Sequence, residues 1–127
     1  MKLVVTGGRG FIGSHFVELA LKNGCSVVDI DKMTYASSQN LSFDLNPRYS
    51  LIEKDICDLV HIPPCDAIVN FAAESHVDNS IAGPATFFNS NTRGVFNLLE
   101  LTRGKIYNRP LFLHISTDEV YGDIRGT

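Results

Sequence analysis

The sequence predicts an α/β domain with a doubly wound parallel sheet of about five strands and helices on both faces. Three features predict this class. Short apolar runs alternate with helical patterns along the chain, which is typical of βαβ units. The runs are apolar at nearly every position, as expected of strands that are covered on both faces. A glycine-rich turn joins the first run to the first helical pattern, and the crossovers of such a sheet are right-handed.

Five apolar runs are expected to form the strands. They cover residues 3–5, 27–30, 50–53, 67–69 and 111–115, and the run at 50–53 is the weakest. Between Asp55 and Asp66 the chain reads only ICDLVHIPPC. Its two prolines leave little room for a helix, so we expect the third crossover to be a short strap.

Two segments show the periodicity of helices with one apolar face. The first follows the glycine turn and is expected to stop at Gly24, because glycine readily adopts the left-handed conformation that ends helices. The residues of this helix that are expected to face the core are Ile12, Phe16, Leu19 and Ala20. The second helix is expected over about 85–102, with the inward residues Phe88, Val95, Leu98 and Leu99.

Residues 1–127 are expected to form one domain, since a chain that is 44% hydrophobic and 20% charged is ordinary for a single globular domain. Cys25, Cys57 and Cys65 lack the spacing of metal ligands and the histidines do not cluster, so no metal site is expected. A net charge of −3 without a basic run gives no reason to expect nucleic acid or membrane as partner. The N-terminus lacks a signal-peptide pattern, and we expect a cytoplasmic protein.

The segment TGGRGFIG, residues 6–13, follows the first strand and opens the first helix. In this setting Gly7 allows a tight turn, Gly10 lets the backbone approach a pyrophosphate closely, and Gly13 lets the helix lie close to the sheet. The N–H groups at the helix N-terminus attract phosphates. The pattern therefore indicates a Rossmann-type dinucleotide site. The alternative is a glycine-rich turn that only packs, whereas a P-loop is excluded because no Gly-Lys-Ser/Thr follows.

Asp31 ends the second strand, 18 positions after Gly13, where dinucleotide-binding domains carry an acidic residue for the adenosine ribose. A carboxylate there accepts hydrogen bonds from the ribose hydroxyls and repels a 2′-phosphate, so NAD is favoured over NADP as the cofactor. Lys32 weakens this preference, because a neighbouring cation tolerates the extra phosphate. Asp29 lies two residues earlier on the same strand. As an alternative, either aspartate is only a solvated strand end.

Several stretches spread over the chain resemble one known family. They are TGGRGFIGS (6–14), DKMTYA (31–36), DIC (55–57), FAAESHVDNSI (71–81), GP (83–84), NTRG (91–94) and ISTDEVYG (115–122). With them the chain resembles the extended short-chain dehydrogenase/reductase family. The stretches AAESHVD and STDEVYG resemble, within that family, the nucleotide-sugar 4,6-dehydratases that act on dTDP-glucose.

The resemblance implies a set of residues that contact NAD. Phe11 and Ile12 would lie on the pyrophosphate. The residues implied at the adenosine part are Asp31, Lys32, Met33 and Thr34 for the ribose and Asp55 and Ile56 for the adenine. The residues implied along the rest of the cofactor are Ala72, Ala73, Ser75 and Ser90. Ser75 would also reach the nucleotide-sugar substrate, and Ser90 keeps a hydroxyl where the family usually has threonine.

The resemblance also implies a reaction for the adjacent carboxylates. NAD removes hydride from C4 of the glucose ring, and the resulting ketone acidifies the C5 proton. Glu119 would take that proton as base, Asp118 would protonate the departing C6 hydroxyl, and Thr117 would hydrogen-bond the C4 oxygen. Hydride then returns to C6 and leaves a 4-keto-6-deoxy sugar. Repulsion and unequal desolvation can give two neighbouring carboxylates the different protonation states that this needs.

Geometry sets a condition on this reaction. Successive residues of a strand point to opposite faces, so both carboxylates reach one sugar only if the backbone leaves the extended form after Thr117. The alternative is structural, because residues 116–119 also fit a capping box that merely starts a helix.

One part of the family pattern is missing. Family members use a tyrosine held by a lysine four residues later, and none of the four tyrosines of this chain has a lysine at that interval. We therefore expect the chain to be the truncated N-terminal part of a dehydratase, inactive alone and without the C-terminal substrate domain. The resemblance implies a homodimer. The alternatives are a non-catalytic NAD-binding module and a sibling nucleotide-sugar epimerase or decarboxylase.

Overall fold

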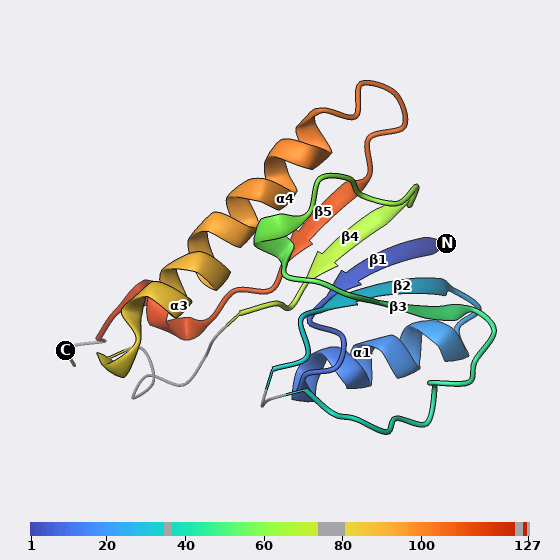
Figure 1. Ribbon diagram of the computed structural model, residues 1–127, viewed down its shortest axis with the longest axis horizontal. Helices are drawn as coiled ribbons and strands as arrows, with labels where there is room; N and C mark the ends of the chain where they lie inside the picture. The colour runs from blue at the N-terminus through green and yellow to red at the C-terminus, as the bar shows by residue number, and fades with distance from the viewer. Residues whose placement is uncertain (35–36, 74–80, 124–125, 127) are drawn as a thin grey trace.

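The computed structural model describes residues 1–34, 37–73, 81–123 and 126. These residues form a five-stranded sheet with the order β3-β2-β1-β4-β5, and each neighbouring pair is parallel (Figure 1). The strands are β1 (Lys2–Thr6), β2 (Ser26–Asp31), β3 (Tyr49–Glu53), β4 (Ala67–Asn70) and β5 (Leu111–His114). The predicted fold class and the five predicted strands are confirmed.

Helical elements cover both faces of this sheet. They are α1 (Phe11–Lys22), the 3-10 turn η1 (Ile56–Asp58), α3 (Pro84–Phe88), the π-helical turn η2 (Asn89–Arg93), α4 (Gly94–Arg103) and the 3-10 turn η3 (Asp118–Tyr121). Val5 of β1 belongs to one core with Val17 of α1, and the adjacent Val4 belongs to a second core with Leu98 of α4. Because adjacent strand residues point to opposite faces, α1 and α4 lie on opposite sides of the sheet (Figure 1).

The first predicted helix is present, but its buried face differs from the predicted one. Phe16 and Ala20 contact the core as predicted, whereas Ile12 and Leu19 are 63% and 59% exposed. The buried residues of α1 are Gly13, Val17, Ala20 and Leu21. This face is selected by a backbone contact, because a Cβ added to Gly13 would lie 2.2 Å from a carbonyl oxygen of the glycine turn. The helix therefore turns its glycine toward the sheet and two apolar side chains toward solvent.

The second predicted helix is interrupted. The π-helical turn η2 separates α3 from α4, and the extra residue of a π turn rotates the two helices relative to each other. Leu98 is fully buried as predicted and Val95 is half-buried. The prediction is wrong for Phe88 and Leu99, which are 56% and 46% exposed. Gly94 instead packs onto Ile56, whose Cδ1 would lie 2.4 Å from an added Cβ.

The third crossover is the predicted short strap. After η1 the chain runs without further helix to β4, and buried Leu59 and Ile62 contribute to the same core as Leu98. The side chain of Asn97 in α4 donates hydrogen bonds to the carbonyl oxygens of Ile56 and Leu59 at 2.8 and 2.9 Å. Apolar side chains of the strap thus fill the space that a crossover helix would occupy.

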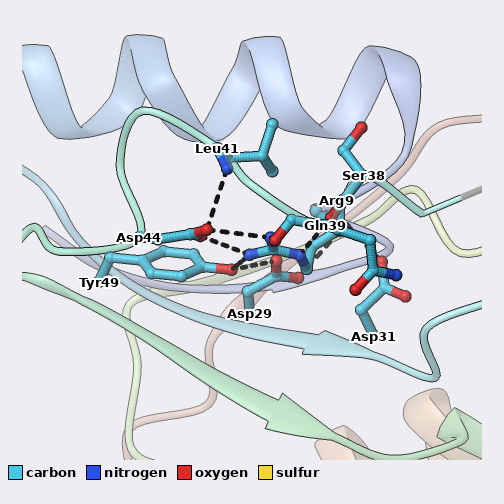
Figure 2. Close-up of polar contacts among 9 residues, drawn as sticks. Arg9, Asp29, Asp31, Ser38, Gln39, Leu41, Asp44 and Tyr49 are labelled. Atoms are coloured by element: carbon cyan, nitrogen blue, oxygen red, sulfur yellow. Dashed lines mark hydrogen bonds and ion pairs between the residues drawn. The ribbon is translucent and has the colours of Figure 1, made fainter.

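Asp29 of β2 is a buried carboxylate, not the solvated strand end considered above. It is fully buried and accepts hydrogen bonds from the Gly8 N–H at 2.9 Å and the Tyr49 hydroxyl at 2.8 Å (Figure 2). Burial raises the pKa of Asp29 to about 6, although these two hydrogen bonds oppose the shift. The sheet therefore holds an acidic group directly beneath the glycine turn.

Replacing Gly13 with alanine should destabilise the fold. The added methyl would meet backbone 2.2 Å away, so the turn or the helix must move, at a cost of about 1–3 kcal/mol. Gly94→Ala is the matched control, because its nearest contacts are the side-chain atoms Cδ1 and Cγ1 of Ile56, at 2.4 and 2.6 Å, and not backbone. Urea denaturation should show a larger loss of unfolding free energy for Gly13→Ala, and equal losses would contradict the argument.

Replacing Asp29 with asparagine should change how stability depends on pH. The pKa of Asp29 is about 6 in the folded chain against a reference value of 3.8, so the wild type loses stability as the pH rises through this range. The neutral amide does not ionise. The unfolding free energy of Asp29→Asn relative to wild type should therefore rise by about 2–3 kcal/mol from about pH 4 to about pH 7. Parallel stability curves from denaturation at several pH values would disprove this.

Candidate functional site

The carboxyl ends of the central strands surround a pocket at β1, where the strand order reverses. Parallel α/β sheets bind ligands at such a position. The predicted cofactor residues that line the pocket are Gly7, Gly10, Asp31, Lys32, Thr34, Asp55, Ile56, Ala72, Ala73 and Ser90. The other lining residues are Ile30, Ser37, Lys54 and Phe71. The structure thus gathers most of the predicted cofactor residues in one place.

The glycine turn closes one side of this pocket. Gly7 has a φ of +71°, and a Cβ at this position would lie 2.8 Å from the backbone nitrogen of Ala72. The N-cap of α1 is Gly10, so no side chain at this position caps the first N–H groups of the helix. Because Gly10 also lines the pocket, the N-terminal N–H groups of α1 lie at its border. Such groups bind phosphate.

Asp31 presents an oriented carboxylate to the pocket. Its Oδ1 accepts hydrogen bonds from the Met33 N–H and the Ser37 hydroxyl, both at 2.8 Å. Its Oδ2 accepts from the Arg9 N–H at 3.1 Å. Asp31 is only 7% exposed. One of the three donors lies in the glycine turn, and the other two lie in the connection that follows β2. The carboxylate is therefore held in place and can accept a hydrogen bond from a hydroxyl group of a ligand.

Some predicted cofactor residues lie outside the pocket lining. Phe11 and Ile12 are 81% and 63% exposed at the start of α1, and Gly13 is buried against the glycine turn. Met33 has a φ of +59°, and its N–H donates a hydrogen bond to Asp31. Ser75, predicted to contact both cofactor and substrate, lies outside the described residues.

The two predicted catalytic carboxylates lie at the same edge of the sheet as the pocket. The extended chain ends at Thr117, and η3 begins at Asp118, so the backbone leaves the extended form where the prediction requires it. A capping box over residues 116–119 would use Ser116 as its N-cap, whereas the N-cap of η3 is Thr117 and makes no side-chain capping hydrogen bond. A hydrogen bond from Thr117 lowers the pKa of the exposed Glu119 carboxyl. Neither carboxylate lines the pocket itself.

A row of hydrogen bonds connects β5 to the pocket. The Thr6 hydroxyl of β1 donates to the side-chain oxygen of Asn70 in β4. The Asn70 amide nitrogen lies 2.9 Å from Nδ1 of His114 in β5, and the Ala72 N–H donates to the Thr6 hydroxyl at 3.4 Å. Thr6 and Asn70 are fully buried. The row therefore fixes the ends of three strands relative to one another, just before the segment that carries the carboxylates.

Sequence reasoning missed four lining residues. Lys54 and Phe71 directly follow β3 and β4, and the rule that parallel sheets bind ligands at the carboxyl ends of their strands would have indicated them. The same rule would have indicated Ile30, which lies next to Asp31 at the carboxyl end of β2. Ser37 carries no such signal, because it lies six residues beyond its partner Asp31 in an irregular connection.

The described residues show no metal-binding cluster and no membrane span. Cys25, Cys57 and Cys65 are free thiols, and within the described part of the chain no group of three or more histidine, cysteine or acidic residues could hold a metal ion. No helix in that part is long and apolar enough to cross a bilayer.

Comparison with known proteins identifies a family and several relatives of this chain. A sequence profile of the family described as GDP-mannose 4,6 dehydratase matches residues 4–127. The chain is 43% identical over 142 residues to a dTDP-glucose 4,6-dehydratase of Neisseria meningitidis serogroup B, a match that covers 99% of this chain and 40% of that protein. The chain thus spans about two fifths of the length of the curated relatives that it matches.

Two kinds of solved structure are similar to the chain. DesIV, a dTDP-glucose 4,6-dehydratase from Streptomyces venezuelae with NAD bound, matches with a TM-score of 0.86 and 41% identity over 100% of this chain and 42% of its own. A UDP-Glc/GlcNAc 4-epimerase from Campylobacter jejuni matches with a TM-score of 0.85 and 28% identity over 98% of this chain and 40% of its own. The profile match over nearly the whole chain shows that this protein belongs to the GDP-mannose 4,6 dehydratase family, in which it resembles the N-terminal part of dTDP-glucose 4,6-dehydratases.

Proposed function

We propose that residues 1–127 are the NAD-binding domain of a nucleotide-sugar 4,6-dehydratase that acts on dTDP-glucose. The observation that carries the proposal is the pocket in which the glycine turn, the N-terminus of α1 and the Asp31 carboxylate meet. A dTDP-glucose 4,6-dehydratase of the same fold holds NAD. The cytoplasmic location and the homodimer expected from the sequence remain predictions.

The residues present fit the chemical groups of NAD. Glycine at position 7 leaves a cradle that a Cβ would fill, and the N–H groups of α1 suit the pyrophosphate. Asp31 suits the hydroxyls of the adenosine ribose. The residues assigned to the adenine are Asp55 and Ile56, and those assigned to the rest of the cofactor are Phe11, Ile12, Gly13, Ala72, Ala73, Ser75 and Ser90. Bound NAD would supply reversible hydride transfer.

The carboxylates past β5 are proposed to move protons on the sugar. Glu119 is ionised at neutral pH, since its carboxyl is exposed and a hydrogen bond from Thr117 lowers its pKa further. This is the form that a general base needs. Asp118 is assigned as the general acid for the departing hydroxyl, and Thr117 as the donor to the C4 oxygen. Residues 1–127 contain no tyrosine followed by lysine four positions later. We infer that this chain binds NAD without the rest of the enzyme but does not dehydrate the sugar.

A 4-epimerase is the second candidate, because an epimerase structure matches the fold with a TM-score of 0.85. The adjacent carboxylates Asp118 and Glu119 favour the dehydratase, since elimination of water needs both a base and an acid. A non-catalytic NAD-binding module would need only the pocket.

Calorimetric titration of the 127-residue chain should show binding of NAD that is stronger than binding of NADP. Asp31→Asn should weaken NAD binding about tenfold or more, because hydrogen bonds to a charged group contribute about 1.5–3 kcal/mol. It should also narrow the preference over NADP, since Lys32 and Lys54 line the pocket. No detectable heat at millimolar NAD would count against the proposed function.

A chimera that joins residues 1–127 to the remainder of the Neisseria enzyme tests the reaction. With dTDP-glucose it should form a product that is lighter by one water, detected by mass spectrometry. Asp118→Asn should lower its turnover by about 10²–10⁴, the usual contribution of a general acid. The matched control is Asp123→Asn, an exposed acidic residue just after η3, which should leave turnover unchanged. Retained formation of the dehydrated product in the Asp118 variant would contradict the role of Asp118 as general acid, whereas a chimera that gives a product of unchanged mass would favour the epimerase.

A further inference from the structure

Arg9 is a buried cation in the glycine turn. It is 3% exposed and does not line the pocket, and its guanidinium lies against the connection between β2 and β3 (Figure 2). It donates to the carbonyl oxygens of Ser38 at 2.8 Å and Gln39 at 2.7 Å. It also donates to both carboxylate oxygens of Asp44, at 2.6 and 3.2 Å, and to the Tyr49 hydroxyl at 3.3 Å. Every hydrogen-bonding edge of the guanidinium is thus used within the protein.

The charge of Arg9 is balanced by Asp44. Arg9 lowers the pKa of the Asp44 carboxyl, chiefly through the hydrogen bond between them. Asp44 is itself tied to its own loop, because it accepts from the Leu41 N–H at 2.9 Å. An unpaired buried cation would be costly, so the pair keeps this connection closed against the turn. With its guanidinium occupied by Asp44, Arg9 is not a ligand for the phosphates of a cofactor.

The backbone of Arg9 completes a two-sided contact around Asp31. The Ser38 N–H donates to the Arg9 carbonyl oxygen at 2.8 Å, opposite the bond that the Arg9 side chain gives to the Ser38 carbonyl. This pair of bonds holds the neighbouring Ser37, whose hydroxyl donates to Asp31 at 2.8 Å. The Arg9 N–H donates to the other oxygen of Asp31. Each oxygen of the carboxylate therefore accepts a hydrogen bond from a group that Arg9 provides or holds, and Oδ1 also accepts from the Met33 N–H.

We propose that Arg9 is a positioning residue that orients the Asp31 carboxylate toward the 2′-hydroxyl of the adenosine ribose by clamping the β2–β3 connection onto the glycine turn. This inference rests on the proposed binding of NAD. It predicts that Arg9 governs how well the pocket distinguishes a ribose with a 2′-hydroxyl from one without it. A residue that only stabilised the fold would lower the unfolding free energy and leave this discrimination unchanged.

The test uses the 127-residue chain and two ligands, NAD and its analogue with 2′-deoxyribose on the adenosine side. Calorimetry gives the ratio of their dissociation constants. We expect a ratio of about ten or more in the wild type, the value of one charge-assisted hydrogen bond. Arg9→Ala should bring the ratio to about three or less, and Arg9→Lys should give an intermediate ratio, because an ammonium keeps the charge but cannot reach all these acceptors at once.

Arg48→Ala is the matched control. Arg48 lies in the same connection and donates to the Leu21 carbonyl oxygen at 2.8 Å, at the opposite end of α1 from the pocket. It should lower stability and preserve the ratio. If Arg9→Ala does not fold by circular dichroism, Arg9→Lys and Asp44→Asn decide, and each should lower the ratio. An unchanged ratio in folded Arg9 variants would overturn the inference, whereas a wild type that binds neither ligand would overturn the proposed function itself.

Discussion

The close contact between the glycine turn and the start of the segment after β4 is the constraint on which the site depends. Gly7 adopts a left-handed conformation and passes so near Ala72 that a side chain would collide with its backbone. Gly13 brings α1 still closer to the same turn, with 2.2 Å between an added Cβ and the turn against 2.8 Å between a Cβ at Gly7 and Ala72. With no Cβ at either position, the N-terminus of α1 reaches the carboxyl edge of the sheet. The pocket, the exposed face of α1 and the place of Asp31 all follow from this approach.

Much of the fold could be predicted because its signals are local. Each strand is a short apolar run, and the spacing of the glycines indicates the turn. The strand positions and the fold class could therefore be predicted without knowledge of distant contacts. The short strap after Asp55 was also predictable, since two prolines exclude a helix. The same locality explains why Asp31 could be assigned to the pocket, because it ends a predicted strand 18 positions after Gly13, where such domains carry an acidic residue.

The features that escaped prediction depend on contacts between distant segments. The burial of Asp29 requires Tyr49 and Gly8, and the pairing of Arg9 with Asp44 joins residues 35 positions apart. Helix faces were misjudged for a related reason. An apolar residue such as Leu19 looks inward by periodicity, but the approach of Gly13 rotates α1, and the π turn η2 rotates α4. Periodicity shows that a helix has an apolar face but not which edge of that face is pressed onto the sheet.

The two ends of one edge of the sheet differ in how deeply their carboxylates are buried. On the β2 side, the buried guanidinium of Arg9 pairs with Asp44, and the buried Asp31 carboxylate lines the pocket. On the β5 side, the carboxylates Asp118 and Glu119 are exposed. Their strand is held by its pairing with β4 and by the row from Thr6 through Asn70 to His114. A binding group benefits from a rigid, desolvated setting, whereas a proton-transferring pair needs access to its substrate. The different burial of the two ends is therefore what the proposed roles of Asp31 and of the Asp118 and Glu119 pair require.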